Sequence, residues 1–108
     1  MAELQLIYTT WPDAALAENA AHTLLEERLI ACANIFPAGR SVFRWEGEVQ
    51  AEAETVMILK TGAGRASAVR DRVSALHPYD TPAIVGIPAL DGATCANFAA
   101  WVVAETRG

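Results

Sequence analysis

The chain has 108 residues, 53% of them hydrophobic and 19% charged, and its 13 acidic and 8 basic residues give a net charge of -5. This length suits one domain with one core, and the apolar fraction exceeds that of a disordered chain. The acidic residues are dispersed, and no basic cluster offers the positive surface that nucleic acid or an anionic membrane requires. We therefore expect a single folded domain over residues 1–108, with neither nucleic acid nor membrane as a partner.

The two cysteines, Cys32 and Cys95, are far apart in the sequence and form no pair at zinc-binding spacing. The first residues show no basic segment followed by a long apolar one, and no stretch approaches the roughly 20 apolar residues of a membrane span. Free thiols and a cytoplasmic location are the expectation.

The first residues predict a strand followed by a helix. Residues 4–10 are rich in β-branched and aromatic side chains and stop before Trp11-Pro12, so they favour a strand that ends where proline interrupts the ladder. Asp13 can cap the helix that follows. Its apolar stripe is narrow and made of small residues, namely Ala17, Ala20, Ala21 and Leu24.

A long hairpin is predicted next. Residues 30–36 and 41–45 favour one strand with a bend or bulge at Pro37-Ala38-Gly39. Glu46-Gly47 makes a tight turn into a third strand over residues 49–61, whose apolar end favours a central place in a sheet.

The remaining residues predict a helix, a short strand and a last helix. The helical spacing of apolar residues from Ala66 to Leu76 ends at His77-Pro78. Residues 83–87, held between two prolines, favour a strand at an edge or with limited pairing. After the Asp91-Gly92 turn, a third helix is expected to place four residues on its apolar face: Cys95, Phe98, Ala99 and Val102.

The resulting order, β-α-β-β-α-β with an additional C-terminal helix, predicts an α+β, ferredoxin-like fold with an antiparallel sheet. Because the second and third strands are longer than the others, the hairpin over residues 41–53 should project beyond the sheet and expose unpaired edges. Pairing with another chain would cover these edges.

Five motifs spread over nearly the whole chain resemble those of one family and occur in its order. They are Tyr8-Thr9-Thr10-Trp11-Pro12-Asp13, Glu27-Arg28-Leu29-Ile30-Ala31-Cys32-Ala33-Asn34 with Pro37, Trp45-Glu46-Gly47, Ile58-Leu59-Lys60-Thr61, and His77-Pro78-Tyr79-Asp80-Thr81-Pro82. The chain thus resembles the CutA divalent-cation tolerance family. The resemblance implies a ferredoxin-like protomer, a homotrimer held by strand pairing between subunits, and a role in tolerance to copper and other divalent metals. It implies no accepted reaction, so we do not expect an enzyme.

His77 is the one candidate metal ligand. The resemblance implies, for some members of the family, a copper site built from a first-strand cysteine, a histidine at the His-Pro-Tyr motif and a nearby carboxylate. Here Thr9, Leu76 and Ala83 stand at positions where such ligands would be, and only His77 carries over. The alternative is that His77 caps the carbonyl groups at the helix end.

A set of polar and aromatic residues forms a candidate cleft between subunits, since several matching positions line such a cleft in the family. Its members are Cys32, Trp45, Glu46, Glu54, Lys60, Tyr79 and Asp80. Aromatic walls with a lysine and carboxylates suit a small anion or a metal complex. Alternatively, Lys60 pairs with a carboxylate, Tyr79 fixes the trimer by a hydrogen bond, and Cys32 is a small buried hydrophobe.

Two functions follow from these features. The first is a homotrimer that binds copper or another divalent cation weakly at its subunit interface, with a role in metal tolerance. The second, by fold analogy, is a trimeric signalling or scaffold protein that resembles the PII proteins and binds a small effector in a cleft between subunits. A third hypothesis is an enzyme that uses Lys60, Tyr79 and a carboxylate.

Overall fold

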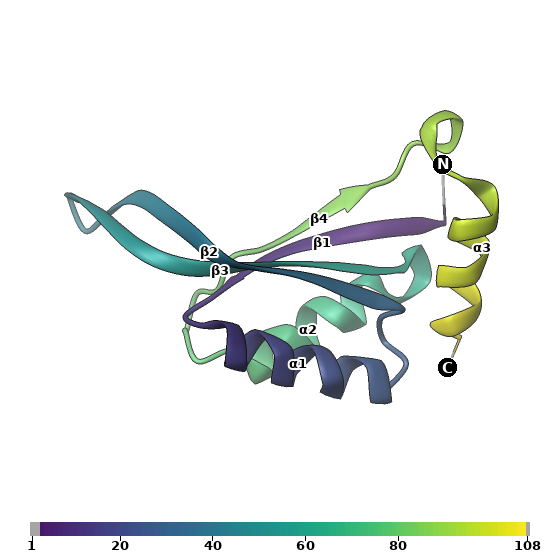
Figure 1. The fold of residues 1–108 in the computed structure, drawn as a ribbon, viewed down its shortest axis with the longest axis horizontal. Coiled ribbons are helices and arrows are strands. Elements are labelled where there is room, and N and C mark those ends of the chain that lie inside the picture. The colour runs from purple at the N-terminus through teal and green to yellow at the C-terminus, as the bar shows by residue number, and fades with distance from the viewer. Residues whose placement is uncertain (1–2, 108) are drawn as a thin grey trace.

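The computed structural model describes residues 3–107, which form a four-stranded antiparallel sheet and three α-helices (Figure 1). In chain order the elements are β1 (Leu4–Trp11), α1 (Ala14–Glu26), β2 (Cys32–Trp45), β3 (Glu48–Gly62), α2 (Ala66–Leu76), β4 (Ile84–Pro88) and α3 (Ala96–Glu105). The strands lie in the order β2-β3-β1-β4. The predicted ferredoxin-like α+β fold, with its additional C-terminal helix, is therefore confirmed.

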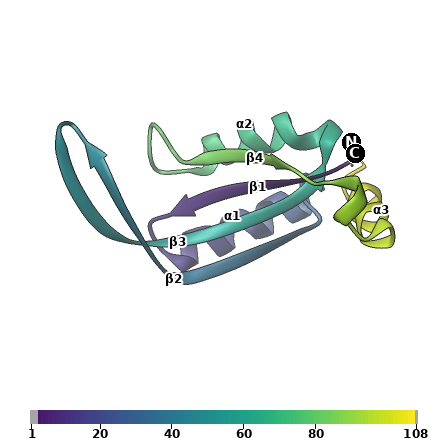
Figure 2. The same cartoon turned by 90° about the horizontal axis from the view of Figure 1, so that it is seen from above.

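Helices α1 and α2 lie against one face of the sheet, and α3 stands at one end of it (Figure 2). The Asp13 carboxylate accepts a hydrogen bond of 2.8 Å from the Leu16 backbone N–H, so the predicted cap of α1 is present. The small buried stripe of α1 lets its backbone approach the sheet closely. Within residues 3–107, none of the helices is both long and apolar enough to cross a membrane.

The core lies between the sheet and these two helices. On β1 and β3 the odd-numbered residues face the helices, as the buried Ile7, Trp11, Met57 and Leu59 show. Truncating one of them, for example by Leu59→Ala, is expected to cost ~2–5 kcal/mol, a large part of the stability of a small domain. This face therefore specifies the fold.

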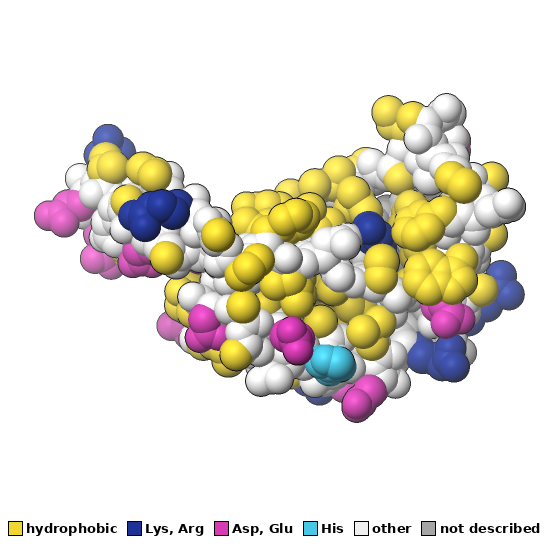
Figure 3. All heavy atoms as spheres, in the orientation of Figure 1, with side chains coloured by type: hydrophobic (Ala, Val, Ile, Leu, Met, Phe, Trp, Pro, Cys, Tyr) yellow, Lys and Arg dark blue, Asp and Glu magenta, His cyan; other side chains and the backbone are white. Residues whose placement is uncertain are grey.

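The opposite face of the sheet is apolar but largely uncovered. It consists of the alternate residues of each strand, and several large side chains there remain exposed: Phe36, Val85 and Ile87. Two more exposed aromatic side chains, Phe98 and Trp101, lie on α3 at the end of this face. Figure 3 shows hydrophobic side chains gathered over the sheet side away from α1 and α2 and around α3.

The hairpin of β2 and β3 projects well beyond the other strands (Figure 1). Strand β1 ends opposite Thr55, so the part of β3 from Glu48 to Glu54 pairs only with β2. At the tip, Glu46 and Gly47 both have positive φ angles, of 50° and 81°, as a type I′ turn requires. The predicted projection and tight turn are both present.

A register shift between Phe36 and Gly39 changes which β2 side chains share a face with β3. Before the shift Phe36 pairs with Val56, and after it Gly39 pairs with Glu54. The odd-numbered residues of the outer β2 segment therefore join the even-numbered residues of β3. The predicted bulge is confirmed, although β2 starts at Cys32 rather than at residue 30.

The prediction for one core residue is wrong. Cys95 was expected on the buried side of the last helix, but it is the N-terminal cap residue of α3 and is exposed. Apolar residues occur on nearly all sides of α3, with Phe98 and Trp101 among the exposed ones, so spacing alone could not show that Cys95 is the cap.

Candidate functional site

His77 ends α2 and turns its ring into the protein. Its side chain is 7% exposed, and its Nε2 lies 2.8 Å from the carbonyl oxygen of Thr10. Its Nδ1 accepts a hydrogen bond of 3.1 Å from the backbone N–H of Tyr79. Because a carbonyl can only accept, the proton of the ring lies on Nε2. Both nitrogens are thus engaged within one chain.

Aromatic rings enclose His77 on two sides. Its ring centroid lies 4.4 Å from that of Trp11 and 4.9 Å from that of Tyr79. A metal ion at either nitrogen would have to displace the bond to Thr10 or the bond from Tyr79. The role of His77 as a metal ligand stays a prediction, and the structure gives the residue a bracing role between α2, β1 and the turn that follows.

Thr9 is fully buried on the helix-facing side of β1. Its hydroxyl donates to the carbonyl oxygen of Met57 and accepts from the indole N–H of Trp11, both at 2.8 Å. This hydroxyl therefore links two strands and holds the Trp11 ring that packs on His77.

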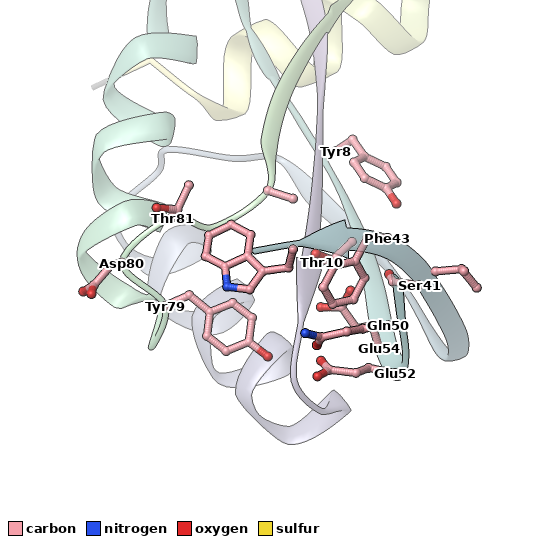
Figure 4. Close-up of a pocket in the computed structure, with 13 residues that line it drawn as sticks. Tyr8, Thr10, Ser41, Phe43, Gln50, Glu52, Glu54, Tyr79, Asp80 and Thr81 are labelled. Atoms are coloured by element: carbon pink, nitrogen blue, oxygen red, sulfur yellow. The ribbon is translucent and has the colours of Figure 1, made fainter. Parts of the chain in front are cut away.

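A pocket of about 730 Å³ opens where the projecting hairpin meets β1 and the turn after His77 (Figure 4). Three carboxylates and four aromatic rings contribute to its lining. The lining residues are Tyr8, Thr10, Ser41, Val42, Phe43, Trp45, Gln50, Glu52, Glu54, Tyr79, Asp80, Thr81 and Ala83. The volume lies in the range typical of small-molecule sites.

The glutamates of the pocket act on Tyr79. In Figure 4 the Tyr79 hydroxyl points toward Glu52 and Glu54, whereas the Asp80 carboxylate points away from them. Loss of solvent around the ring, and then the negative charges of Glu54 and Glu52, raise the pKa of Tyr79. The pocket therefore carries a negative potential near the tyrosine hydroxyl.

The pocket gathers four of the seven predicted cleft residues, namely Trp45, Glu54, Tyr79 and Asp80. The other three lie elsewhere: Glu46 is at the hairpin tip, and Cys32 pairs with Lys60 near the far end of the sheet. The Lys60 Nζ lies 5.5 Å from the centre of the Phe98 ring on α3. The lysine therefore does not belong with the carboxylates.

Several lining residues were missed, and the alternation of β3 could have found two of them. Gln50 and Glu52 share a strand face with Glu54 because they precede it by four and two residues. Ser41 and Phe43 could not be assigned in this way, because their face depends on the register shift in β2.

The part of the chain that the structure describes holds no preformed metal centre. Among residues 3–107, no group of three or more His, Cys, Asp or Glu side chains is placed to hold an ion. Glu52 and Glu54 line one pocket together, and carboxylate oxygens suit hard divalent cations. The Asp80 carboxylate lines the same pocket but points away from these two, and Ser41 and Gln50 add further oxygen atoms to the lining.

The fold and the pocket define a ferredoxin-like α+β protein with an acidic, aromatic cavity beside a projecting hairpin. The family model described as CutA1 divalent ion tolerance protein matches residues 5–105. The chain belongs to this family, as the motifs of the sequence predicted.

Relatives and solved structures agree with this assignment. The chain is 40% identical over 102 residues to the divalent-cation tolerance protein CutA of Pyrococcus horikoshii, covering 94% of this chain and 97% of that one. The crystal structure of CutA1 from Ehrlichia chaffeensis matches with a TM-score of 0.91 at 39% identity, covering 99% and 98% of the two chains. A structure of the Archaeoglobus fulgidus protein, described as periplasmic, matches with a TM-score of 0.90 at 40% identity, covering 96% and 99%.

Proposed function

We propose that this chain acts in tolerance to divalent metals, copper among them, as a homotrimer that binds metal ions weakly at its subunit interfaces. The observation that carries the proposal is the pair of carboxylates, Glu52 and Glu54, which line an open pocket at the base of a hairpin with an unpaired edge. A second subunit at that edge can supply the remaining ligands.

Two surfaces of the chain support assembly. The apolar sheet face away from α1 and α2 exposes Phe36, Val85 and Ile87, and such a face is stable in water only when it is small or covered. The outer segment of β3, from Glu48 to Glu54, has β2 on one side and no strand of residues 3–107 on the other. An added strand would satisfy its free backbone groups.

Weak rather than tight metal binding is proposed because of the ligands at hand. The pocket offers carboxylates but neither thiolate nor imidazole, and these softer ligands confer high affinity for Cu(II) or Zn(II). The thiol of Cys32 lies toward the opposite end of the sheet, and both nitrogens of His77 are engaged.

Light scattering and calorimetry test the two parts of the proposal separately. We expect a mass of three chains, and a Cu(II) isotherm that weakens in the double variant Glu52→Gln/Glu54→Gln but not in Glu18→Gln/Glu26→Gln, whose exposed side chains lie on α1. The two variants change the net charge equally. A monomer would contradict the assembly, and equal isotherms would contradict the carboxylate site.

A second candidate is the PII-like trimer that binds a small effector, and the size and aromatic lining of the pocket favour it. A pocket of about 730 Å³ is much larger than a metal ion requires. A thermal-shift screen distinguishes the candidates, since an effector would raise the melting temperature in the absence of metal. In both cases we propose a single, cytoplasmic, non-catalytic domain.

A further inference from the structure

The pocket combines negative charge with exposed aromatic surface. In the single chain, Trp45 is 54% exposed and Tyr79 is 42% exposed, although large aromatic side chains usually gain stability by burial. Both line the same cavity as Glu52 and Glu54. An aromatic wall beside carboxylates is the chemical pattern that receives a positively charged organic group.

The register of the hairpin places these groups on one face. Ser41 pairs with Glu52, Phe43 with Gln50, and Gly39 with Glu54, so β2 brings Phe43 and β3 brings Glu52 and Glu54 to one face of the hairpin. Side chains of directly paired residues lie on the same face of a sheet. The mixture of ring and carboxylate is therefore built into the β2–β3 ladder.

Basic side chains lie away from this pocket. Arg40 and Arg44 pair with Ala53 and Val49, which belong to the opposite face of the hairpin. Lys60 lies six residues along β3 from Glu54, which corresponds to a distance of about 20 Å in a strand. Among the lining residues that the structure describes, none is Lys or Arg. An anionic ligand therefore finds no counter-charge here.

We propose that the pocket binds an organic ammonium ion, with its N–H groups facing Glu52 and Glu54 and its apolar part against Trp45, Phe43 and Tyr79. Carboxylates accept charge-assisted hydrogen bonds from an ammonium group, and the aromatic faces attract the same charge. This ligand class deepens the proposed function because it uses the same pocket. It differs from metal binding in its need for the aromatic wall.

Benzylammonium and benzyl alcohol are a matched pair of probes, since they have similar shapes and differ in charge. Calorimetric titration of the assembled wild-type protein should show saturable binding of benzylammonium, with benzyl alcohol at least about tenfold weaker. Glu52→Gln/Glu54→Gln should remove this preference, whereas Glu18→Gln/Glu26→Gln on α1 should keep it. Equal affinity for the two probes would overturn the proposal.

The aromatic wall has its own control. Trp45→Leu should weaken benzylammonium about threefold or more and leave the Cu(II) isotherm unchanged. Trp101→Leu removes a similarly exposed indole on α3, outside the pocket, and should change neither isotherm. Unchanged benzylammonium binding in Trp45→Leu would overturn the proposed geometry.

The same samples separate this inference from the proposed function. If the trimer binds Cu(II) but does not bind benzylammonium, the organic-cation site is overturned and metal binding stays in place. Binding of benzylammonium only after dilution has dissociated the assembly would show that a second copy fills the pocket, which also overturns the inference. Benzylammonium binding without any Cu(II) isotherm would support the inference and contradict the metal site.

Discussion

The His77 ring is joined to Thr10 by a hydrogen bond of 2.8 Å between Nε2 and the backbone carbonyl oxygen, across 67 positions of sequence. The bond connects the end of α2 to the last part of β1, directly beside the pocket. The second nitrogen, Nδ1, accepts the N–H of Tyr79 and so orients the turn that carries a pocket wall. His77 therefore helps to position Tyr79 beside the pocket.

Removing the His77 ring should destabilise the protein. His77→Ala leaves the buried carbonyl oxygen of Thr10 without its partner and opens a cavity against Trp11, at an expected cost of about 2–4 kcal/mol in the free energy of unfolding. His77→Gln keeps a donor for Thr10 and should lose less. Urea unfolding measures both, with the exposed His22→Ala as the control. Equal stability of His77→Ala and wild type would contradict the bracing role.

Tyr79 should ionise at a higher pH than an ordinary tyrosine. Its pKa is raised by loss of solvent and by Glu54 and Glu52, so Glu52→Gln/Glu54→Gln should bring the pKa part of the way back. The pKa of Tyr79 is higher in the folded state than in the unfolded state. Its contribution to the free energy of unfolding is therefore present below the unfolded-state pKa and is lost as the pH rises through the folded-state pKa. Ultraviolet titration in a Tyr8→Phe background isolates Tyr79, since the chain has two tyrosines. A pKa that does not move in the double variant would contradict the acidic pocket.

Gly39 should not accept a side chain. A Cβ atom there would lie 2.6 Å from the carbonyl oxygen of Glu54, closer than packing allows. Gly39→Ala must therefore shift the ladder at the bulge, at an expected cost of about 1–3 kcal/mol in the free energy of unfolding. Gly86→Ala on β4 meets no atom within 4 Å and is the matched control. Equal unfolding midpoints for the two variants would contradict the close approach.

The ion pair between Glu27 and Arg72 should make stability depend on acid pH. Arg72 donates three hydrogen-bond contacts to the Glu27 carboxylate, at 2.8–3.2 Å, and this bonding lowers the pKa of Glu27. The stabilisation is thus present above the ordinary glutamate pKa of about 4.3 and is lost as the pH falls through the lower folded value. Unfolding curves for wild type and Glu27→Gln should converge toward acid pH. A difference in the free energy of unfolding between wild type and Glu27→Gln that stays constant with pH would contradict this linkage.

The fold could be predicted from the sequence because its signals are local. The alternation around Ile7, the helical spacing of Val69 and Val73, and the bend at Gly39 each act over a few residues. Their order then selects the ferredoxin-like arrangement, because few topologies accept it.

The site was predicted only in part because its contacts are distant in sequence. A histidine before proline indicates a helix end, but nothing near His77 in the sequence reveals that its ring reaches Thr10. Lys60 shares a strand face with Glu54, yet the length of the strand separates them. The place of Trp45 on the pocket face depends on a one-residue change of register, which residue types alone do not determine.

A copper-soaked crystal tests the central claim, that the carboxylates of the hairpin pocket receive the metal, against the sequence-based prediction that His77 does. The account predicts an anomalous difference peak beside Glu52 and Glu54, with ligands from a neighbouring subunit, and with the bond from His77 to Thr10 intact. A peak on a ring nitrogen of His77, with that bond broken, would contradict it, as would a pocket without copper at saturating concentration.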